Sequence, residues 1–189
     1  MAEFPKPTLK PIRRVVTGND AQGRSRVLYD GPAPNVNPGA VSPSSGMTDL
    51  WVFDRCPADI SGERDDGALP FRFEPPAAGG HLRIVQSAGR PADYDPAKDA
   101  SAVPVHEPRQ RRDGTWDKGG QNAFSSPIHK SQTVDYGILL EGERVLLLDD
   151  GERVLKPGDV VVQLGNWHGW TNPREASLMA FIMMGAAKP

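Results

Sequence analysis

The sequence predicts an all-β fold, a sandwich or barrel of short strands, and three observations support this. The 189 residues include 20 glycines and 19 prolines, and breakers this frequent leave little room for long helices. Between them stand short segments rich in Val, Leu, Ile, Phe and Trp, the pattern of strands joined by turns. Apolar residues make up 38% and charged residues 24% of the chain, with a net charge of −2, which is typical of one globular domain with a core.

The first part of the chain, residues 1–86, is predicted to be a strand-rich extension that packs on a barrel formed further along. Its candidate strands are Arg13–Val16, Arg26–Tyr29, Met47–Phe53, Phe71–Phe73 and His81–Gln86. These strands are short and widely spaced. Because 189 residues are rather few for two domains, we expect one structural domain overall. Arg72 and Arg83 lie on neighbouring candidate strands. We expect both to be solvated, with binding of a substrate carboxylate as the alternative.

Residues 87–124 differ in character, because they are polar, rich in Asp, Arg, Gly and Pro, and almost without apolar periodicity. A structureless connection of this length is uncommon inside a compact domain. Composition favours a mobile loop, and a lid over a site or an arm around a partner subunit are the alternatives. Trp116 is the large side chain that would anchor the segment.

Residues 125–189 carry the densest series of strand signals. The candidate segments are Thr133–Glu141, Arg144–Leu148, Glu152–Leu155, Val160–Leu164, Gly165–Asn172 and Leu178–Met184. Asp149-Asp150-Gly151 and Pro157-Gly158-Asp159 supply tight turns between them. About six strands within roughly sixty residues close naturally into an antiparallel barrel or jelly roll.

Charge and composition exclude several classes of partner. There is no basic excess that would bind nucleic acid and no Lys/Arg-rich amphipathic stretch that would bind a membrane surface. The longest apolar run, Leu178–Ala187, has about half the length needed to span a bilayer. A single cysteine, Cys56, excludes an internal disulfide framework. Residues Met1–Asp20 lack the apolar core of a secretory signal, so we expect a cytoplasmic protein.

Two short motifs in the last third of the chain resemble those of the cupin superfamily. The first is His129-Lys130-Ser131 followed by Asp135 and Gly142, where the family has His-x-His, Glu and Gly. The second, Gly165-Asn166-Trp167-His168 through Asn172, matches the family's Gly-x-x-His-x-x-x-Asn in full. The resemblance implies a cupin-type double-stranded β-helix, or jelly-roll barrel, with an N-terminal β extension. It also implies a homodimer.

The resemblance further implies a divalent metal ion, for which His129, Asp135 and His168 are the predicted ligands and catalytic residues. Ser131 stands where the family has its second histidine, and a hydroxyl is a poor metal ligand. Two histidines and one carboxylate suit iron, manganese, nickel or zinc, and the alternative is that no metal is bound. Six residues separate His129 from Asp135, roughly 20 Å in a straight strand, so both reach one ion only if the chain reverses between them.

Further side chains are predicted to contact a small-molecule substrate or ligand inside the barrel. They are Ser131, Tyr136, Gln163, Trp167 and Trp170. The two tryptophans flank the histidine of the second motif, where they would form an aromatic wall, and apolar core packing is the alternative. His81 has no motif around it, and we expect it to be structural or exposed.

The first functional hypothesis is a metal-dependent enzyme acting on a small carbonyl- or carboxylate-bearing molecule, with the metal as a Lewis acid. Because one family histidine is lost, lyase, isomerase, dehydratase or decarboxylase chemistry is favoured over dioxygenase chemistry. The second hypothesis is a metal-free barrel that binds a small ligand as a sensor or carrier, and Ser131 favours it. A third is a metal-independent acid–base enzyme, which would stay active in chelator.

Overall fold

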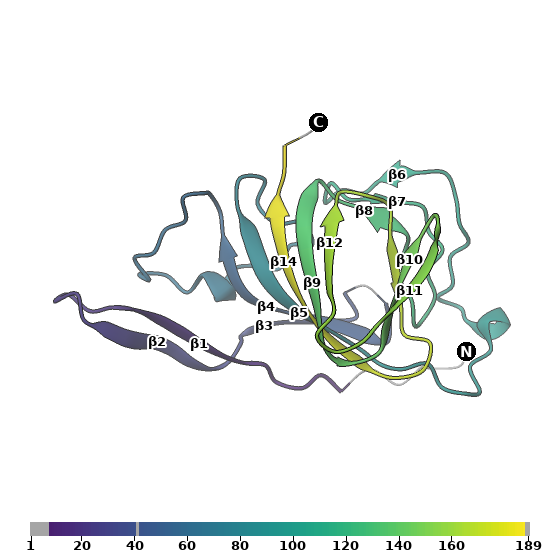
Figure 1. Ribbon diagram of the computed structural model, residues 1–189, viewed down its shortest axis with the longest axis horizontal. Helices are drawn as coiled ribbons and strands as arrows, with labels where there is room; N and C mark the ends of the chain where they lie inside the picture. The colour runs from purple at the N-terminus through teal and green to yellow at the C-terminus, as the bar shows by residue number, and fades with distance from the viewer. Residues whose placement is uncertain (1–7, 41, 188–189) are drawn as a thin grey trace.

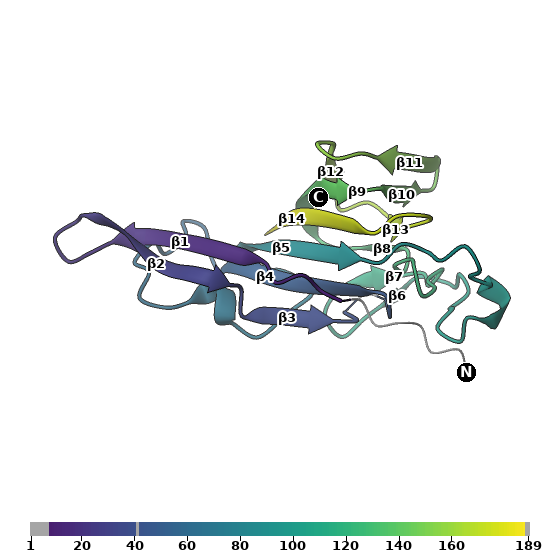
Figure 2. The same cartoon turned by 90° about the horizontal axis from the view of Figure 1, so that it is seen from below.

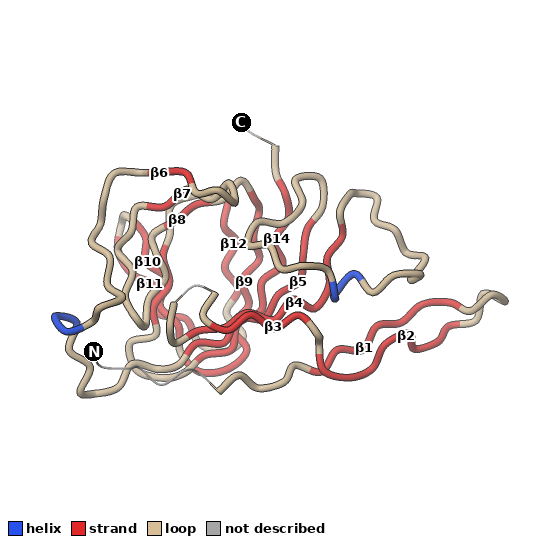
Figure 3. Tube along the Cα trace, turned by 180° about the vertical axis from the view of Figure 1, so that it is seen from behind, coloured by secondary structure: helices blue, strands red, loops and turns tan. Residues whose placement is uncertain are grey.

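The computed structural model describes residues 8–40 and 42–187. Residues 1–7 and 41, which belong to the predicted 1–86 segment and in part to Met1–Asp20, and residues 188–189 of the predicted 125–189 segment lie outside the described residues. Within the described ranges the chain forms strands and two short 3₁₀ helices, η1 (Asp66–Ala68) and η2 (Pro96–Lys98). Strands dominate the trace in Figure 3. The predicted all-β class is confirmed. No helix in these ranges is long and apolar enough to cross a membrane.

One six-stranded antiparallel sheet forms the larger wall of the barrel, in the order β12-β9-β14-β5-β4-β3. Its strands are β3 (Asn35–Pro38), β4 (Ser45–Phe53), β5 (Gly80–Ser87), β9 (Thr133–Gly142), β12 (Val160–Leu164) and β14 (Ser177–Gly185). The strand β14 pairs with β5 on one side and with β9 on the other. Figure 1 shows these strands side by side, so β4 and β5 from the first half share a sheet with the strands that follow the first motif.

Two smaller sheets form the opposite wall, in the orders β11-β10-β13 and β6-β7-β8. Their strands are β6 (Arg109–Gln110), β7 (Trp116–Asp117), β8 (His129–Lys130), β10 (Arg144–Leu148), β11 (Gly151–Leu155) and β13 (Gly169–Thr171). A β-bridge between His129 and His168 connects the two sheets. The predicted turn between β10 and β11 is present, but it consists of Asp149 and Asp150 alone, because Gly151 pairs with Leu148 and begins β11.

The strands β1 (Arg13–Asn19) and β2 (Ser25–Pro32) form a hairpin that projects to one side of the barrel (Figures 1 and 2). Arg14 anchors its base, since its guanidinium pairs with Asp65 and donates to the carbonyl of Leu50 on β4. Further out, Val15 and Val27 are half exposed, at 50% and 52%. The hairpin is thus attached to the sheet mainly at one end.

The core lies between the two walls, and the alternation along β9 shows how strands divide their side chains. Thr133, Asp135 and Leu139 are buried, whereas Tyr136 and Leu140 on the opposite face are exposed. The buried apolar cluster comprises Met47, Val85, Leu139, Leu146, Leu155, Trp170, Met179, Phe181 and Met183. A layer of this kind supplies the main hydrophobic stabilisation of the barrel.

The predicted strand Phe71–Phe73 is wrong, because this segment is irregular. The backbone carbonyls of this segment are bonded by a side chain and not by a neighbouring strand. The Arg83 guanidinium donates to the carbonyl of Arg72 at 2.6 Å and to that of Phe73 at 3.0 Å. The same guanidinium pairs with Asp49 at 2.6 Å and is 1% exposed. The expectation of a solvated Arg83 is therefore also wrong, and Asp49 supplies the counter-charge that its burial requires.

Residues 87–124 contain η2, β6 and β7, which pair through few residues. Buried carboxylates organise this segment in place of apolar packing. Asp117 is bonded to Arg111 at 2.7 Å and to the backbone nitrogen of Gly119 at 3.0 Å. Asp99 accepts from the backbone nitrogen of Ala123 at 2.7 Å. Because polar side chains hold this segment together, its sequence shows no hydrophobic periodicity from which its structure could be predicted.

Candidate functional site

A cavity of about 40 Å³ lies inside the barrel, between the two walls. Its polar lining consists of Arg83, Ser126, His129, Asp135, Arg144, Gln163 and His168. The structure thus brings the three predicted metal ligands to one cavity, although their positions in the sequence span forty residues. A volume of this size holds about three water-sized groups.

His129 and His168 face one another across the β-bridge, with their ring centroids 4.3 Å apart. The Nδ1 of His129 lies 2.8 Å from the carbonyl oxygen of Pro127, and the Nδ1 of His168 lies 3.0 Å from that of Asn166. A carbonyl can only accept a hydrogen bond, so each Nδ1 carries the proton and each Nε2 keeps its lone pair.

Burial keeps both imidazoles neutral. It lowers the pKa of His129 below the ordinary value, and it lowers the pKa of His168 to about 3, with the neighbouring His129 ring adding to the effect. Neutral rings with a free Nε2 are hydrogen-bond acceptors and metal ligands. The pair can therefore receive a proton donor of a ligand or bind a cation.

Asp135 and Gln163 lie opposite one another on β9 and β12 and are 4% and 3% exposed. Within the described residues, the Oδ1 of Asp135 and both amide atoms of Gln163 are buried and have no hydrogen-bond partner. Burial raises the pKa of Asp135 to about 6. Because an unpaired buried polar atom costs about 1–3 kcal/mol, such atoms at a cavity indicate a place where a ligand supplies the missing donors and acceptors.

A chain of hydroxyl groups leads from Asp135 away from the cavity. The Thr133 hydroxyl donates to the Asp135 carboxylate, and the Ser131 hydroxyl lies 2.6 Å from that of Thr133. Since the Thr133 proton is used, Ser131 must be the donor in this second bond. Ser131 borders a groove on the outside of the barrel, next to Trp116 and Lys130. The structure therefore places Ser131 behind Asp135, and it does not place it in the cavity lining.

The fit of these residues to a divalent metal ion is partial. Both histidines offer a free Nε2 and have Nδ1 fixed by a carbonyl, an arrangement that is typical of metal-bound histidine. In the part of the chain that the structure describes, however, no three His, Cys, Asp or Glu side chains come together as a group that could hold a metal. The predicted chain reversal between His129 and Asp135 is present, since β8 and β9 belong to different sheets. The histidines form a pair, and Asp135 does not join them as a third ligand.

The remaining predicted contacts divide between the two faces of their strands. Trp170 lines the cavity, is 4% exposed and packs edge-on against His168 and Phe181, with centroid distances of 6.1 and 5.6 Å. Tyr136 is 37% exposed on the outer face, because its neighbour Asp135 points inward. Trp167 lies under the ammonium groups of two lysines on the outside, with distances to its ring centroid of 4.4 and 4.9 Å. The structure thus places Tyr136 and Trp167 away from the cavity.

Comparison with known proteins is consistent with this architecture. A cupin-domain-containing oxidoreductase of Neurospora crassa is 27% identical over 175 residues, which cover 89% of this chain and 70% of that protein. The phomopsin biosynthesis cluster protein C' of Diaporthe leptostromiformis is 30% identical over 192 residues, covering 97% of this chain and 82% of that protein. This chain belongs to the cupin-domain proteins.

Other comparisons of the cupin cover a shorter stretch of the chain or give a low TM-score. No family model matches the chain. Among solved structures, the cupin domain of Schizosaccharomyces pombe Cnp3 has a TM-score of 0.43 at 10% identity, over 91% of this chain and 86% of that one. A cupin-domain-containing oxidoreductase of Hypocrea virens is 50% identical over 48 residues, 25% of each chain. The expected emphasis on lyase or isomerase chemistry finds no support in these relatives, because those that carry an enzyme name are oxidoreductases.

Two further residues that line the cupin cavity, Phe73 and Arg144, belong to neither motif. Phe73 packs edge-on against His129, with ring centroids 5.8 Å apart, and helps to line the cavity. Next to it, Glu74 accepts a hydrogen bond from the Thr115 hydroxyl at 2.7 Å, and burial raises its pKa to about 7. Arg144, at the start of β10, is 5% exposed and also lines the cavity.

Proposed function

We propose that this cupin is an oxidoreductase that acts on a small organic molecule held inside the barrel, in the biosynthesis of a secondary metabolite. Relatives named as cupin-domain-containing oxidoreductases, and one named for a phomopsin biosynthesis cluster, support the class of reaction and its setting. The observation that carries the proposal is the unpaired polar atoms of Asp135 and Gln163 beside two neutral histidines. Such a buried, convergent polar cluster is typical of a ligand site.

Five side chains would handle protons in this reaction. Asp135, with a pKa of about 6, is mostly ionised at neutral pH, and a carboxylate without full solvation is a strong acceptor for a substrate proton. The Nε2 atoms of His129 and His168 would accept hydrogen bonds from substrate hydroxyl or amine groups. The Thr133 and Ser131 hydroxyls give the proton on Asp135 a route to the outer groove.

A bound divalent metal ion (iron, manganese, nickel or zinc) stays a prediction. His129 and His168 would hold it, and when bound it would supply Lewis-acid or redox chemistry. Elemental analysis of protein purified without a histidine tag, compared with His168→Ala, tests the prediction. Near one metal per chain, lost in the variant, supports it. No metal in either protein, and none retained after adding each of the four metals, refutes it.

The reaction class can be tested without knowing the substrate, by replacing the gene in its own host and profiling the metabolites. We expect Asp135→Asn to accumulate an intermediate that differs from the end product by two hydrogen atoms or by oxygen. Asp150→Asn is the matched control, because Asp150 is exposed in the β10–β11 turn. An accumulated isomer, or a species that differs by water or carbon dioxide, would refute the oxidoreductase proposal in favour of isomerase or lyase chemistry.

A metal-free sensor or carrier is the second candidate function, and Ser131 at the position of the family's second histidine favours it. A carrier would leave the metabolite profile qualitatively unchanged in the Asp135→Asn strain. It would also carry a bound small molecule through purification, which native mass spectrometry detects. Those two results together would replace the enzymatic proposal.

We further propose that the cupin forms a homodimer through the outer face of the large sheet. Apolar side chains on this face are exposed along β12, with Val160 at 57%, Val162 at 54% and Leu164 at 74%. An apolar sheet face of this kind is a typical protein interface. Val162→Lys should convert a dimer into a monomer in light scattering coupled to size-exclusion chromatography, and a monomeric wild-type protein would refute the proposal. The cytoplasmic location stays a prediction.

A further inference from the structure

Three arginine side chains are buried among the residues that the structure describes, and only two of them have a carboxylate partner. Arg14 pairs with Asp65, and Arg83 pairs with Asp49. Arg144, which is 5% exposed, makes no ion pair with a described residue. Its burial therefore calls for a different explanation from that of the other two.

The groups around Arg144 leave part of its guanidinium unused. One terminal nitrogen lies 2.9 Å from the Ser87 hydroxyl and 3.3 Å from the Ser177 hydroxyl. The Nε atom is buried and has no hydrogen-bond partner among the described residues, and the guanidinium carbon lies 5.4 Å from the centroid of the Trp170 ring. Two neutral hydroxyls and an aromatic face do not compensate a buried positive charge as a carboxylate does.

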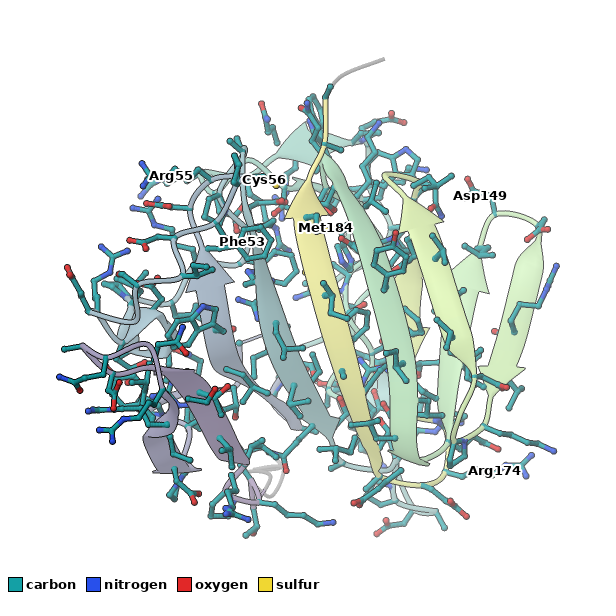
Figure 4. All side chains as sticks on the ribbon, turned by 60° about the vertical axis from the view of Figure 1, so that its left-hand side comes forward. Phe53, Arg55, Cys56, Asp149, Arg174 and Met184 are labelled. Carbon is teal, nitrogen blue, oxygen red and sulfur yellow. The ribbon has the colours of Figure 1, made fainter. Side chains whose placement is uncertain are left out.

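Arg144 lines the cavity at the end opposite to Asp135. Its partner Ser177 starts β14, whereas Asp135 pairs with Met183 near the other end of that strand. These two positions of β14 are six residues apart, roughly 20 Å along the backbone, and the side chains of Arg144 and Asp135 reach inward from them to the same cavity. Figure 4 marks the two ends of the sheet, with Met184 at the Asp135 end and Arg174 at the end where β14 begins. Arg144 therefore lines the cavity towards the start of β14 and Asp135 lines it towards the other end of that strand, and the second guanidinium in the lining, that of Arg83, is neutralised by Asp49.

We propose that Arg144 is the anion-binding subsite of the cavity and that it holds the carboxylate of a small monocarboxylic acid. The Nε edge of a guanidinium matches the two oxygens of a carboxylate, which would satisfy the unpaired Nε. The other end of the molecule then lies towards His168 and Asp135. This assignment names the substrate class for the proposed function and rests on it for its link to catalysis.

The protonation state and the walls of the cavity fit this role. Burial lowers the pKa of Arg144 only to about 10, so the guanidinium is charged at neutral pH. The cavity of about 40 Å³ accepts a short acid directly. A longer one requires displacement of Met47 and Met183, and methionine is the apolar side chain that adapts most easily.

Calorimetric titration tests the subsite with formate, acetate and propionate as probes, and with propionamide and inorganic phosphate as controls. We expect wild-type protein to bind at least one carboxylate at least 10-fold more tightly than propionamide or phosphate. Arg144→Met should weaken that binding at least 10-fold, and Arg144→Lys should weaken it less, because the charge is kept and the planar edge is lost. Equal binding by wild type and Arg144→Met, equal binding of phosphate, or no carboxylate binding would overturn the proposal.

Thermal melting separates a ligand role from a structural one. If Arg144 serves a ligand, Arg144→Met without ligand should melt at the same temperature as wild type or higher, because an uncompensated buried charge is removed. Arg83→Met is the matched control and should melt lower, because it leaves Asp49 buried and unpaired. A melting temperature of Arg144→Met lowered as much as that of Arg83→Met would show a structural role and refute the subsite.

The subsite and the proposed function can fail independently. Asp135→Asn should retain carboxylate binding, because the two residues occupy opposite ends of the cavity. Binding that depends on Arg144, together with an unchanged metabolite profile in the Asp135→Asn strain, would keep the subsite and remove the oxidoreductase proposal. A redox intermediate in that strain without any carboxylate binding would do the reverse.

Discussion

Replacing Asp135 by Asn should stabilise the protein at neutral pH while it removes activity. Burial raises the pKa of this carboxyl from 3.8 to about 6. At about 1.4 kcal/mol per pKa unit, holding the ionised form in the folded protein costs about 3 kcal/mol. Asn cannot ionise, but it leaves a polar group in the same place, so we expect a net gain of about 1–2 kcal/mol. A gain of this size raises the melting temperature by roughly 2–8 °C in a domain of this length.

The gain in stability should depend on pH in a way that identifies the ionisation of Asp135 as its cause. The pKa of Asp135 is higher in the folded than in the unfolded state, so the folded state releases its proton later as the pH rises. Below about pH 4 both states are protonated and the ionisation penalty is absent, and above about pH 6 it is fully present. The stability difference between Asp135→Asn and wild type should therefore grow from pH 4 to pH 6 and then stay constant.

Urea unfolding of both proteins at several pH values between 4 and 8, in chelator, measures this difference. Comparing two proteins at each pH cancels the titration of the buried histidines, which is common to both. Asp49→Asn is the control on the same sheet, and it should lose about 3–5 kcal/mol because it leaves Arg83 unpaired. A difference that does not change with pH, or an Asp135→Asn protein less stable than wild type at pH 8, would refute the reasoning.

Three further predictions concern other parts of the barrel. Gly142→Ala should lose at least about 2 kcal/mol in urea unfolding, because Gly142 has φ +76° and an added Cβ would overlap the carbonyl of Ala176. Burial lowers the pKa of His81 to about 3, so only the unfolded state gains its proton as the pH falls from about 6.5, and stability is lost. His81→Gln should reduce the loss between pH 7 and pH 5, as measured by the urea midpoint. Trp170→Ala should lose about 3–5 kcal/mol and ligand binding, whereas Trp167→Ala should change ligand binding little.

Much of the second half of the fold could be predicted from the sequence, because tight turns bound its strands. The predicted Arg144–Leu148 and Val160–Leu164 coincide with β10 and β12, and Thr133–Glu141 is one residue shorter than β9. The strands of the first half were harder to predict from the sequence. The strand β3 (Asn35–Pro38) is too polar to be detected, and Phe71–Phe73 has the composition of a strand but is held by the Arg83 side chain.

Residues of the candidate site could be predicted where they belong to a motif and where the alternation of neighbouring residues along a strand indicates that the side chain points inward. His129, His168 and Asp135 reach the cavity for that reason. Arg144 was missed because an arginine at the start of a strand indicates a solvated surface. The signal was nevertheless present: Leu146 faces the core, so the residue two positions earlier on β10 faces it too.

The strand β12 reverses the usual division between core and surface, and this reversal connects the site with the proposed assembly. Its polar residue Gln163 is 3% exposed and points into the barrel, whereas Val160, Val162 and Leu164 point outward and are more than half exposed. A one-residue shift of register would bury the three apolar side chains and expose the amide. Pairing with β9 excludes that shift, since Gln163 is opposite Asp135. The proposed ligand would explain the inward amide, and the proposed homodimer would explain the outward apolar residues. Gln163→Leu should therefore raise the stability of the unliganded protein and weaken ligand binding without changing its oligomeric state. Val162→Lys should change the oligomeric state and leave ligand binding intact. If the two variants changed both properties together, the two faces of β12 would not have the separate roles assigned to them.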